Sequence, residues 1–81
     1  MRDQGLPQKR GSALDKALAV LEAITAQSQP IGLPDLSARL KMPRQTVHRI
    51  LTQLEKTGLV VRDPSRDRFS VGPRLSTLAL N

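Results

Sequence analysis

The sequence predicts a mainly α-helical domain that carries one small β-hairpin. Apolar residues recur at helical spacing in three separate segments, and each segment starts near a serine or a proline that favours a helix start. Two short β-prone runs then flank a turn that contains proline, and this pattern predicts the hairpin. A chain of 81 residues has room for one small domain.

The first helix is expected to begin after Ser12, because the segment from Ser12 to Asp15 resembles a capping box. An apolar stripe is expected to face the core and to continue the helix to about residue 26; it consists of Leu14, Ala17, Leu18, Leu21 and Ile24. Residues 1–11 contain two glycines and one proline and show no such periodicity. We therefore expect them to form a flexible basic N-terminal tail.

A second helix is expected from near Pro34 to near Leu40. Proline is tolerated in the first turn because its missing N–H would have no partner there. Leu36 and Leu40 lie four residues apart and share one helix face. Ile31, just before this helix, is expected to form a strand of one or two residues.

The third helix is expected over residues 43–57, where Pro43 favours its start and Gly58 supplies a left-handed stop. Its apolar face consists of Val47, Ile50, Leu51 and Leu54. Met42 falls in the turn before it, where an apolar side chain can sit under the crossing of two helices. Two short helices joined by so tight a turn are typical of the helix-turn-helix, whose second helix usually enters the DNA major groove.

The hairpin is expected from residues 59–62 and 68–71, with the turn at residues 63–67. A helix-turn-helix followed directly by a hairpin is a winged helix. We therefore predict a winged helix-turn-helix over residues 12–72, with a three-helix core and a wing over residues 62–68. After Gly72 a new helical pattern places further leucines on one side, so residues 73–81 are expected to start a linker helix.

Charge and composition narrow the classes of function. The formal net charge is +6, and residues 41–58 carry four cations against Glu55 alone. This concentration favours a phosphate backbone as partner, although charge alone also fits a solvated face. The absence of cysteine removes thiolate metal sites and disulfides. No apolar run approaches the ~20 residues of a membrane span, and no secretory signal is present, so a cytoplasmic protein is expected.

The outer face of the third helix carries the candidate DNA contacts. Four residues at its start or on its outer side are expected to contact base edges: Arg44, Gln45, Thr46 and Arg49. Arginine pairs with guanine, glutamine with adenine, and a threonine methyl packs on the thymine methyl. Five others are expected to contact phosphates: Lys41, Thr52, Lys56, Arg66 and Arg68. Ordinary solvated helix residues remain the alternative for Gln45, Thr52 and Gln53.

His48 is the only histidine and Phe69 the only aromatic residue. A metal site or acid–base catalysis would need partner residues near His48, and none is evident, so we expect no enzyme, metal or cofactor. Two interpretations remain for His48: it contacts DNA, or it occupies a partly buried position on the flank of the helix. Binders of single strands and RNA stack bases on several aromatics, so a single one favours duplex DNA. Phe69 is expected to pack between wing and core.

Three segments together resemble a known family. They are residues 12–18 at the start of the first helix, residues 43–51, and the aromatic-x-x-Gly close of the wing at residues 69–72. In this order they closely resemble the N-terminal winged helix-turn-helix domain of IclR-type bacterial transcriptional regulators. The resemblance covers about residues 12–80. The chain departs from the pattern in two places, with Lys41 where such turns often have glycine and Ser37 where alanine is frequent.

The resemblance implies further properties. It implies sequence-specific binding of a double-stranded DNA operator for regulation of transcription, with His48 added to the groove-facing residues Arg44, Gln45, Thr46 and Arg49. It implies a homodimer or a dimer of dimers through the first helix and the linker helix. It also implies a small-molecule effector, bound by a C-terminal domain that is absent from this chain. The alternative is a winged-helix module for protein–protein contact, which would bind DNA weakly and with little salt dependence.

Overall fold

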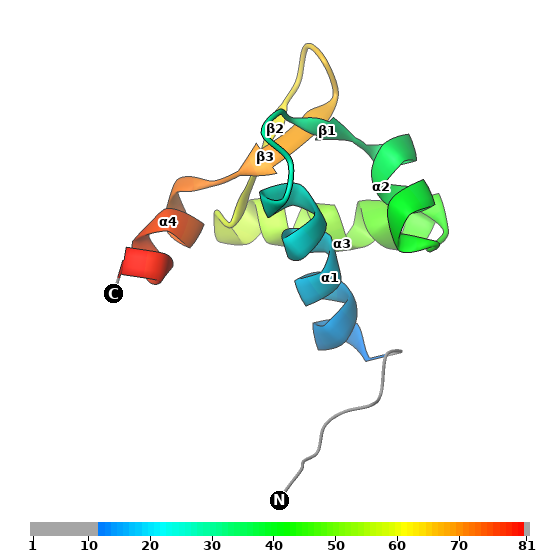
Figure 1. Ribbon diagram of the computed structural model, residues 1–81, viewed down its shortest axis with the longest axis horizontal. Coiled ribbons are helices and arrows are strands. Elements are labelled where there is room, and N and C mark those ends of the chain that lie inside the picture. The colour runs from blue at the N-terminus through cyan, green and yellow to red at the C-terminus, as the bar shows by residue number, and fades with distance from the viewer. Residues whose placement is uncertain (1–11, 81) are drawn as a thin grey trace, which may run out of the picture.

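The structure is a computed structural model that describes residues 12–80. Its elements, in order, are α1 (Ala13–Thr25), β1 (Ile31–Gly32), α2 (Leu33–Leu40), α3 (Arg44–Thr57), β2 (Val60–Asp63), β3 (Arg68–Val71) and α4 (Pro73–Leu80). Figure 1 shows the hairpin projecting above the helices, with α2 and α4 at opposite ends of α3. These elements confirm the predicted winged helix-turn-helix. The basic tail expected over residues 1–11 lies outside the described residues.

The sheet has three antiparallel strands in the order β1-β3-β2. The predicted short strand at Ile31 is confirmed, and it pairs with the wing, because Ile31 lies opposite Phe69. Both side chains are buried, at 4% and 3% exposure. Phe69 therefore packs between wing and core as predicted, and the pairing holds the base of the hairpin against the helical body.

The core confirms the predicted apolar face of α3. Val47, Ile50, Leu51 and Leu54 are all buried, and Leu36 of α2 is completely enclosed with them. The described residues include no buried polar or charged side chain. The core is thus purely apolar, and the polar residues of α3 are left to face outward.

The predicted stripe of α1 is wrong at two positions. Leu14 is 70% exposed and Leu18 is 48% exposed, whereas Val20 is completely buried and Ile24 is 3% exposed. The helix carries two adjacent apolar faces: Val20 and Ile24 lie on one, Leu14 and Leu18 on the other. Periodicity identifies an apolar helix, but it does not determine which of two such faces meets the core.

Both departures from the family pattern lie in or beside the turn between α2 and α3. Lys41 ends α2 in the left-handed conformation, with φ 55° and ψ 43°. The Ser37 hydroxyl donates a hydrogen bond to the Met42 carbonyl, and the Met42 N–H donates to the Ser37 carbonyl at 3.2 Å. Met42 is half-buried against the core, as predicted. Ser37 therefore stabilises the turn that sets the crossing of the two helices.

Replacing Lys41 with glycine is expected to stabilise the fold. A left-handed conformation costs an L-residue about 1–2 kcal/mol, which glycine avoids, although glycine loses more backbone entropy on folding. We expect a net gain of about 0.5–1 kcal/mol in the free energy of unfolding, measured by urea denaturation. Lys41→Ala is the matched control, because it removes the same charge and keeps the strained conformation. Equal stability of the two variants would contradict the argument.

Candidate nucleic-acid interface

The structure brings the five predicted base-contacting residues together on the first turns of α3. Arg44, Gln45, His48 and Arg49 are exposed, and Thr46 is half-buried. The buried stripe of α3 fixes the rotation of the helix, so these side chains are presented on its outer side and flanks. Pro43 precedes the helix and supplies no side-chain cap, and the first turn contains no acidic residue. The start of α3 is therefore polar and basic on its exposed side.

One flank of α3 borders a groove against α1. Thr46, Arg49 and Gln53 line it from α3, and Lys16 lines it from α1. The groove has a volume of about 210 Å³ and contains no acidic lining residue. Two cations thus lie on opposite sides of one small cavity next to the candidate recognition helix. Lys16 was not predicted as a site residue from the sequence, because the sequence pattern does not show that α1 packs beside Arg49.

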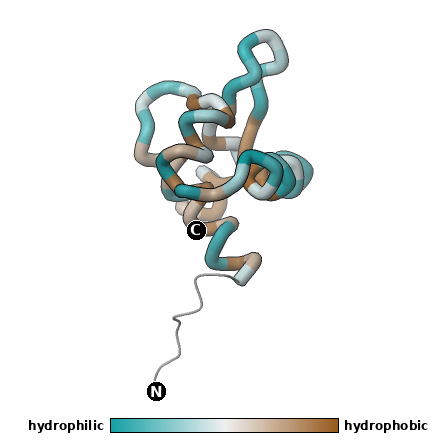
Figure 2. The backbone as a smooth tube through the Cα atoms, turned by 90° about the vertical axis from the view of Figure 1, so that its right-hand side faces the viewer, coloured by the Kyte–Doolittle hydropathy of each residue, from teal (hydrophilic) through white to brown (hydrophobic). Residues whose placement is uncertain are grey.

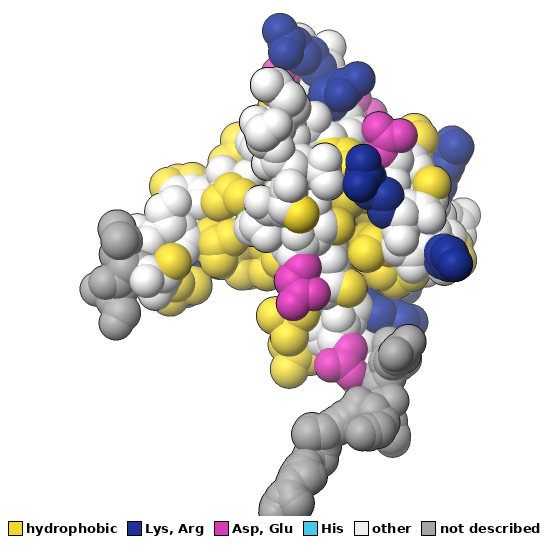
Figure 3. Space-filling view, in the orientation of Figure 1, with side chains coloured by type: hydrophobic (Ala, Val, Ile, Leu, Met, Phe, Trp, Pro, Cys, Tyr) yellow, Lys and Arg dark blue, Asp and Glu magenta, His cyan; other side chains and the backbone are white. Residues whose placement is uncertain are grey.

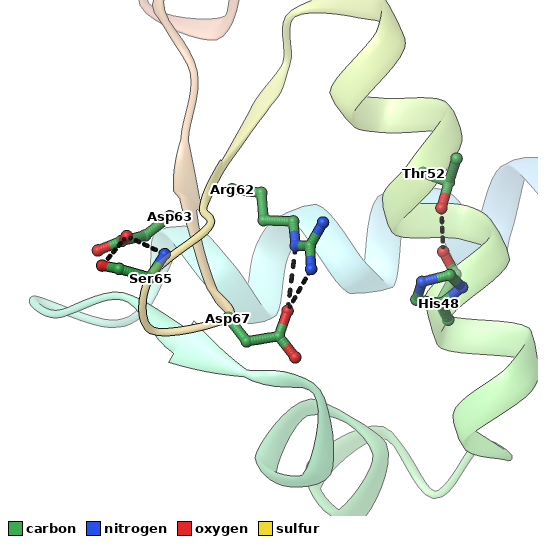
Figure 4. Close-up of polar contacts among 6 residues, drawn as sticks. All are labelled: His48, Thr52, Arg62, Asp63, Ser65 and Asp67. Atoms are coloured by element: carbon green, nitrogen blue, oxygen red, sulfur yellow. Dashed lines mark hydrogen bonds and ion pairs between the residues drawn. The ribbon is translucent and has the colours of Figure 1, made fainter.

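The phosphate contact predicted for Thr52 receives the least support from the structure. The Thr52 hydroxyl donates to the His48 carbonyl at 2.9 Å, within α3 itself (Figure 4). A phosphate oxygen needs a donor, and this hydroxyl proton is already engaged. Lys41 and Lys56, by contrast, are exposed at the two ends of α3. The phosphate contacts predicted for these two lysines therefore remain sterically open.

The wing carries exposed charged residues, and an ion pair links the two sides of its loop. The Arg62 guanidinium contacts the Asp67 carboxylate with its Nε at 3.0 Å and its Nη2 at 2.9 Å (Figure 4). Asp67 itself adopts a left-handed conformation, with φ 54°. The Arg66 side chain is 72% exposed, and its Nε lies 3.9 Å from Oδ2 of Asp63. Arg68 is also exposed. Figure 2 shows the projecting loop as hydrophilic, and Figure 3 shows Lys and Arg side chains at its tip. Arg66 and Arg68 thus lie where the sequence predicted.

The ion pair between Arg62 and Asp67 was not predicted from the sequence. Both residues lie in or beside the predicted turn, so an Arg and an Asp five positions apart across a short hairpin were the available signal. The ion pair is exposed on both sides and contributes little to stability. It links β2 to the residue just before β3, across the loop that carries Arg66.

Asp63 holds the other side of the same turn. Its carboxylate accepts hydrogen bonds from the Ser65 hydroxyl at 2.8 Å and from the Ser65 N–H at 3.0 Å. These bonds, with smaller contributions from Arg66, lower the pKa of Asp63 below its ordinary value. A lowered pKa in the folded state means that the stabilisation is full above the ordinary pKa and is lost as the pH falls through the lowered one.

Ser65→Ala is therefore expected to raise the pKa of Asp63 toward its ordinary value. The measurement is an NMR titration of the Asp63 carboxyl carbon in both proteins. Ser76→Ala, a substitution on the exposed face of α4, is the control and should leave the titration unchanged. An unaltered Asp63 pKa in Ser65→Ala would show that the hydroxyl does not hold the carboxylate.

The C-terminal end of α3 is fastened to α4. Gly58 ends α3 with φ 86°, and its carbonyl accepts from the Arg74 N–H at 3.3 Å. The Arg74 Nη1 donates to the Thr57 carbonyl at 3.0 Å, and the Gly72 N–H donates to the Leu59 carbonyl at 2.9 Å. The start of α4 therefore has a fixed direction relative to α3.

Apolar side chains are exposed on α1, on α4 and on the hairpin, where Val61 and Val71 are 44% and 38% exposed. Leu14 and Leu18 of α1 and Leu78 of α4, at 56% exposure, are the largest of them on the helices. Figure 3 shows hydrophobic surface at the lower end of α1 and along α4. The molecule thus has a basic side at α3 and the wing and an apolar surface on α1 and α4.

Two other kinds of site were searched for over residues 12–80. No cluster of three or more His, Cys, Asp or Glu side chains there is arranged to hold a metal ion. None of the helices in this part of the chain has the length and apolar character needed to cross a membrane.

Comparison with known proteins gives consistent matches. The family model of the IclR helix-turn-helix domain matches residues 13–64. The probable transcriptional regulator SauR of Cupriavidus necator is 37% identical over 70 residues, which are 86% of this chain and 28% of SauR. The HTH-type transcriptional regulator BhcR of Paracoccus denitrificans is 39% identical over 61 residues, which are 75% of this chain and 22% of BhcR.

A solved structure supports the same similarity. The crystal structure of Pseudomonas aeruginosa HmgR is 28% identical and superposes with a TM-score of 0.78, over 84% of this chain and 28% of HmgR. The chain thus spans 28% of the length of SauR and 22% of that of BhcR.

Proposed function

The chain belongs to the IclR helix-turn-helix family, and from that premise we propose that residues 12–72 bind double-stranded DNA sequence-specifically and thereby regulate transcription. The observation that carries the proposal is the outer face of α3, where Arg44, Gln45 and Arg49 are exposed while the opposite face fills the core. The related proteins SauR and BhcR are transcriptional regulators by name. A bacterial cytoplasmic regulator is proposed accordingly.

In the proposed complex α3 lies in the major groove. Its first turns approach the bases most closely, which gives Arg44, Gln45, Thr46, His48 and Arg49 the roles of base contacts. The two arginines provide the most discrimination, because a guanidinium pairs with guanine O6 and N7 through two hydrogen bonds. Neither forms an ion pair with any residue in the described part of the chain. The described residues therefore leave the charge of both arginines available to DNA.

The wing and the ends of α3 hold the backbone. Lys41, Lys56, Arg66 and Arg68 contact phosphates and fix the register of α3 without distinguishing bases. Thr52 can join them only if its hydroxyl leaves the His48 carbonyl. The ion pair between Arg62 and Asp67 holds the wing in a conformation that can lie on the backbone or in the minor groove.

A homodimer or a dimer of dimers is proposed as the binding form. The exposed Leu14, Leu18 and Leu78 on α1 and α4 support it, because apolar surface of this kind is buried in subunit contacts. Two copies of α3 would then bind two half-sites, so the operator would be palindromic or nearly so. A small-molecule effector is proposed to act through a further domain.

Arg49→Ala and Arg66→Ala are expected to weaken binding in different ways. Loss of a bidentate base contact costs about 1–3 kcal/mol on the preferred duplex and reduces the preference over random duplex. Loss of a phosphate contact at Arg66 weakens both duplexes alike and lowers the slope of log K against log salt by about 0.9. Fluorescence anisotropy titrations of both variants on both duplexes measure these effects. If Arg49→Ala leaves the preference intact, the assignment of Arg49 to a base is wrong.

A further inference from the structure

We propose that the groove between α1 and α3 is a phosphate-binding subsite that takes one backbone phosphate of bound DNA, with Lys16 as its principal cation. The inference rests on the proposed function and extends the DNA surface to α1. Lys16 belongs to the body of the domain and not to the helix-turn-helix or the wing. It nevertheless lines the same groove as Thr46, Arg49 and Gln53 of α3.

The electrostatics of the groove favour an anion. Lys16 and Arg49 line it from different helices, and no acidic residue does so. Within residues 12–80, the ion pairs are those of Arg62 with Asp67 and of Arg66 with Asp63, so neither groove cation is neutralised by a described residue. Two charges of the same sign at one cavity repel each other, and a bound anion relieves that repulsion.

The remaining lining residues fit the oxygens of a phosphate. The Thr46 hydroxyl and the Gln53 amide can both donate, and neither forms a side-chain hydrogen bond within the described residues. Ala17 and Ile50 supply an apolar floor. Lys16 is half-buried, and a lysine commonly packs its methylene stem on apolar surface while its ammonium stays in water.

The size of the groove selects the class of ligand. Pockets for small organic molecules usually measure about 300–1,000 Å³. This groove, at about 210 Å³, is smaller than that range but has room for a phosphate group. Its position on the flank of α3 is where a strand backbone passes when the outer face of that helix lies in the major groove. Arg49 borders both the groove and the outer face, so the proposed phosphate site adjoins the base-contacting surface.

The test compares wild type, Lys16→Gln and Lys16→Arg by fluorescence anisotropy, on the preferred duplex and on random duplex at several salt concentrations. We expect Lys16→Gln to weaken both duplexes by the same factor and to lower the salt slope by about 0.9, leaving the preference unchanged. Lys16→Arg keeps the charge and should restore the wild-type slope. Circular dichroism melting checks that both variants are folded.

One result would overturn the proposal while the proposed function stands: a wild-type affinity and salt slope in Lys16→Gln. An NMR titration of the DNA-free protein then distinguishes what the groove does. If inorganic phosphate, but not chloride, shifts the Thr46 and Gln53 amides, the groove is a site for a free anion and not for a DNA phosphate. A wild-type protein that binds no duplex in a salt-dependent way would overturn the proposed function together with this inference.

Discussion

Leu51→Ala is expected to destabilise the domain by about 2–5 kcal/mol, because Leu51 is completely enclosed in the core. The substitution removes apolar contacts and leaves a cavity that the surrounding helices can only partly fill. Small domains are stable by only about 5–15 kcal/mol, so the loss is a large fraction of the total. Urea denaturation measures it directly, as a lower midpoint at an unchanged slope. DNA binding should fall with the fraction of folded protein.

Leu14→Ala is the matched control for this experiment. It makes the same change in side-chain volume at a position that is 70% exposed. The Leu14 side chain buries little apolar area in the folded state, so its truncation removes little of that area. In the monomeric domain, where the dimer contact proposed for Leu14 is absent, we expect the variant's free energy of unfolding to lie within about 0.5 kcal/mol of wild type. Equal costs at Leu14 and Leu51 would contradict the buried face assigned to α1 and the core position of Leu51.

Gly72→Ala is expected to destabilise the junction between the wing and α4 by about 3 kcal/mol. A Cβ at residue 72 would lie 2.3 Å from the Gly58 carbonyl oxygen and 3.0 Å from the Leu59 carbonyl carbon. Both atoms belong to the backbone, so rotation of a side chain cannot relieve the overlap. The chain would have to separate there and lose the hydrogen bond from the Gly72 N–H to the Leu59 carbonyl.

Thermal melting and amide hydrogen exchange measure this effect. We expect a lower Tm and faster exchange at Gly72 and Arg74, whose N–H groups donate to the Leu59 and Gly58 carbonyls. Gly32→Ala is the control, since a Cβ there would meet its nearest atoms at 3.7 Å and 3.9 Å, which are ordinary contacts. Wild-type stability of Gly72→Ala would mean that α4 does not pack against residues 58–59 as the structure describes.

The parts of the fold that follow from local chemistry could be predicted from the sequence. Ser12 caps α1 by accepting from the Asp15 N–H at 3.0 Å, and Gly58 ends α3, as their residue types indicated. The core face of α3 was predictable because its apolar residues form one continuous stripe between polar ones. In α1 the two adjacent apolar faces left the choice to tertiary packing, and the prediction chose wrongly at Leu14 and Leu18.

The same distinction applies to the candidate site. Residues on the exposed side of α3 could be placed from helical periodicity, because the buried stripe determines the opposite face. The groove at Lys16, the bond from Arg74 to Thr57 and the steric role of Gly72 could not, because each joins residues that are distant in sequence. Lys41 shows an intermediate case: its departure from glycine was visible in the sequence, but its left-handed conformation required the structure.

The central claim, sequence-specific binding of duplex DNA, is tested most directly by in vitro selection from randomised duplexes. The selected duplex and random duplex are then titrated with the protein at two salt concentrations. We predict an enriched palindrome or near-palindrome and a steep salt dependence on both DNAs, because phosphate contacts act on any duplex and base contacts on one sequence. No enrichment, with weak binding and little salt dependence, would contradict the claim and favour a winged helix that contacts another protein.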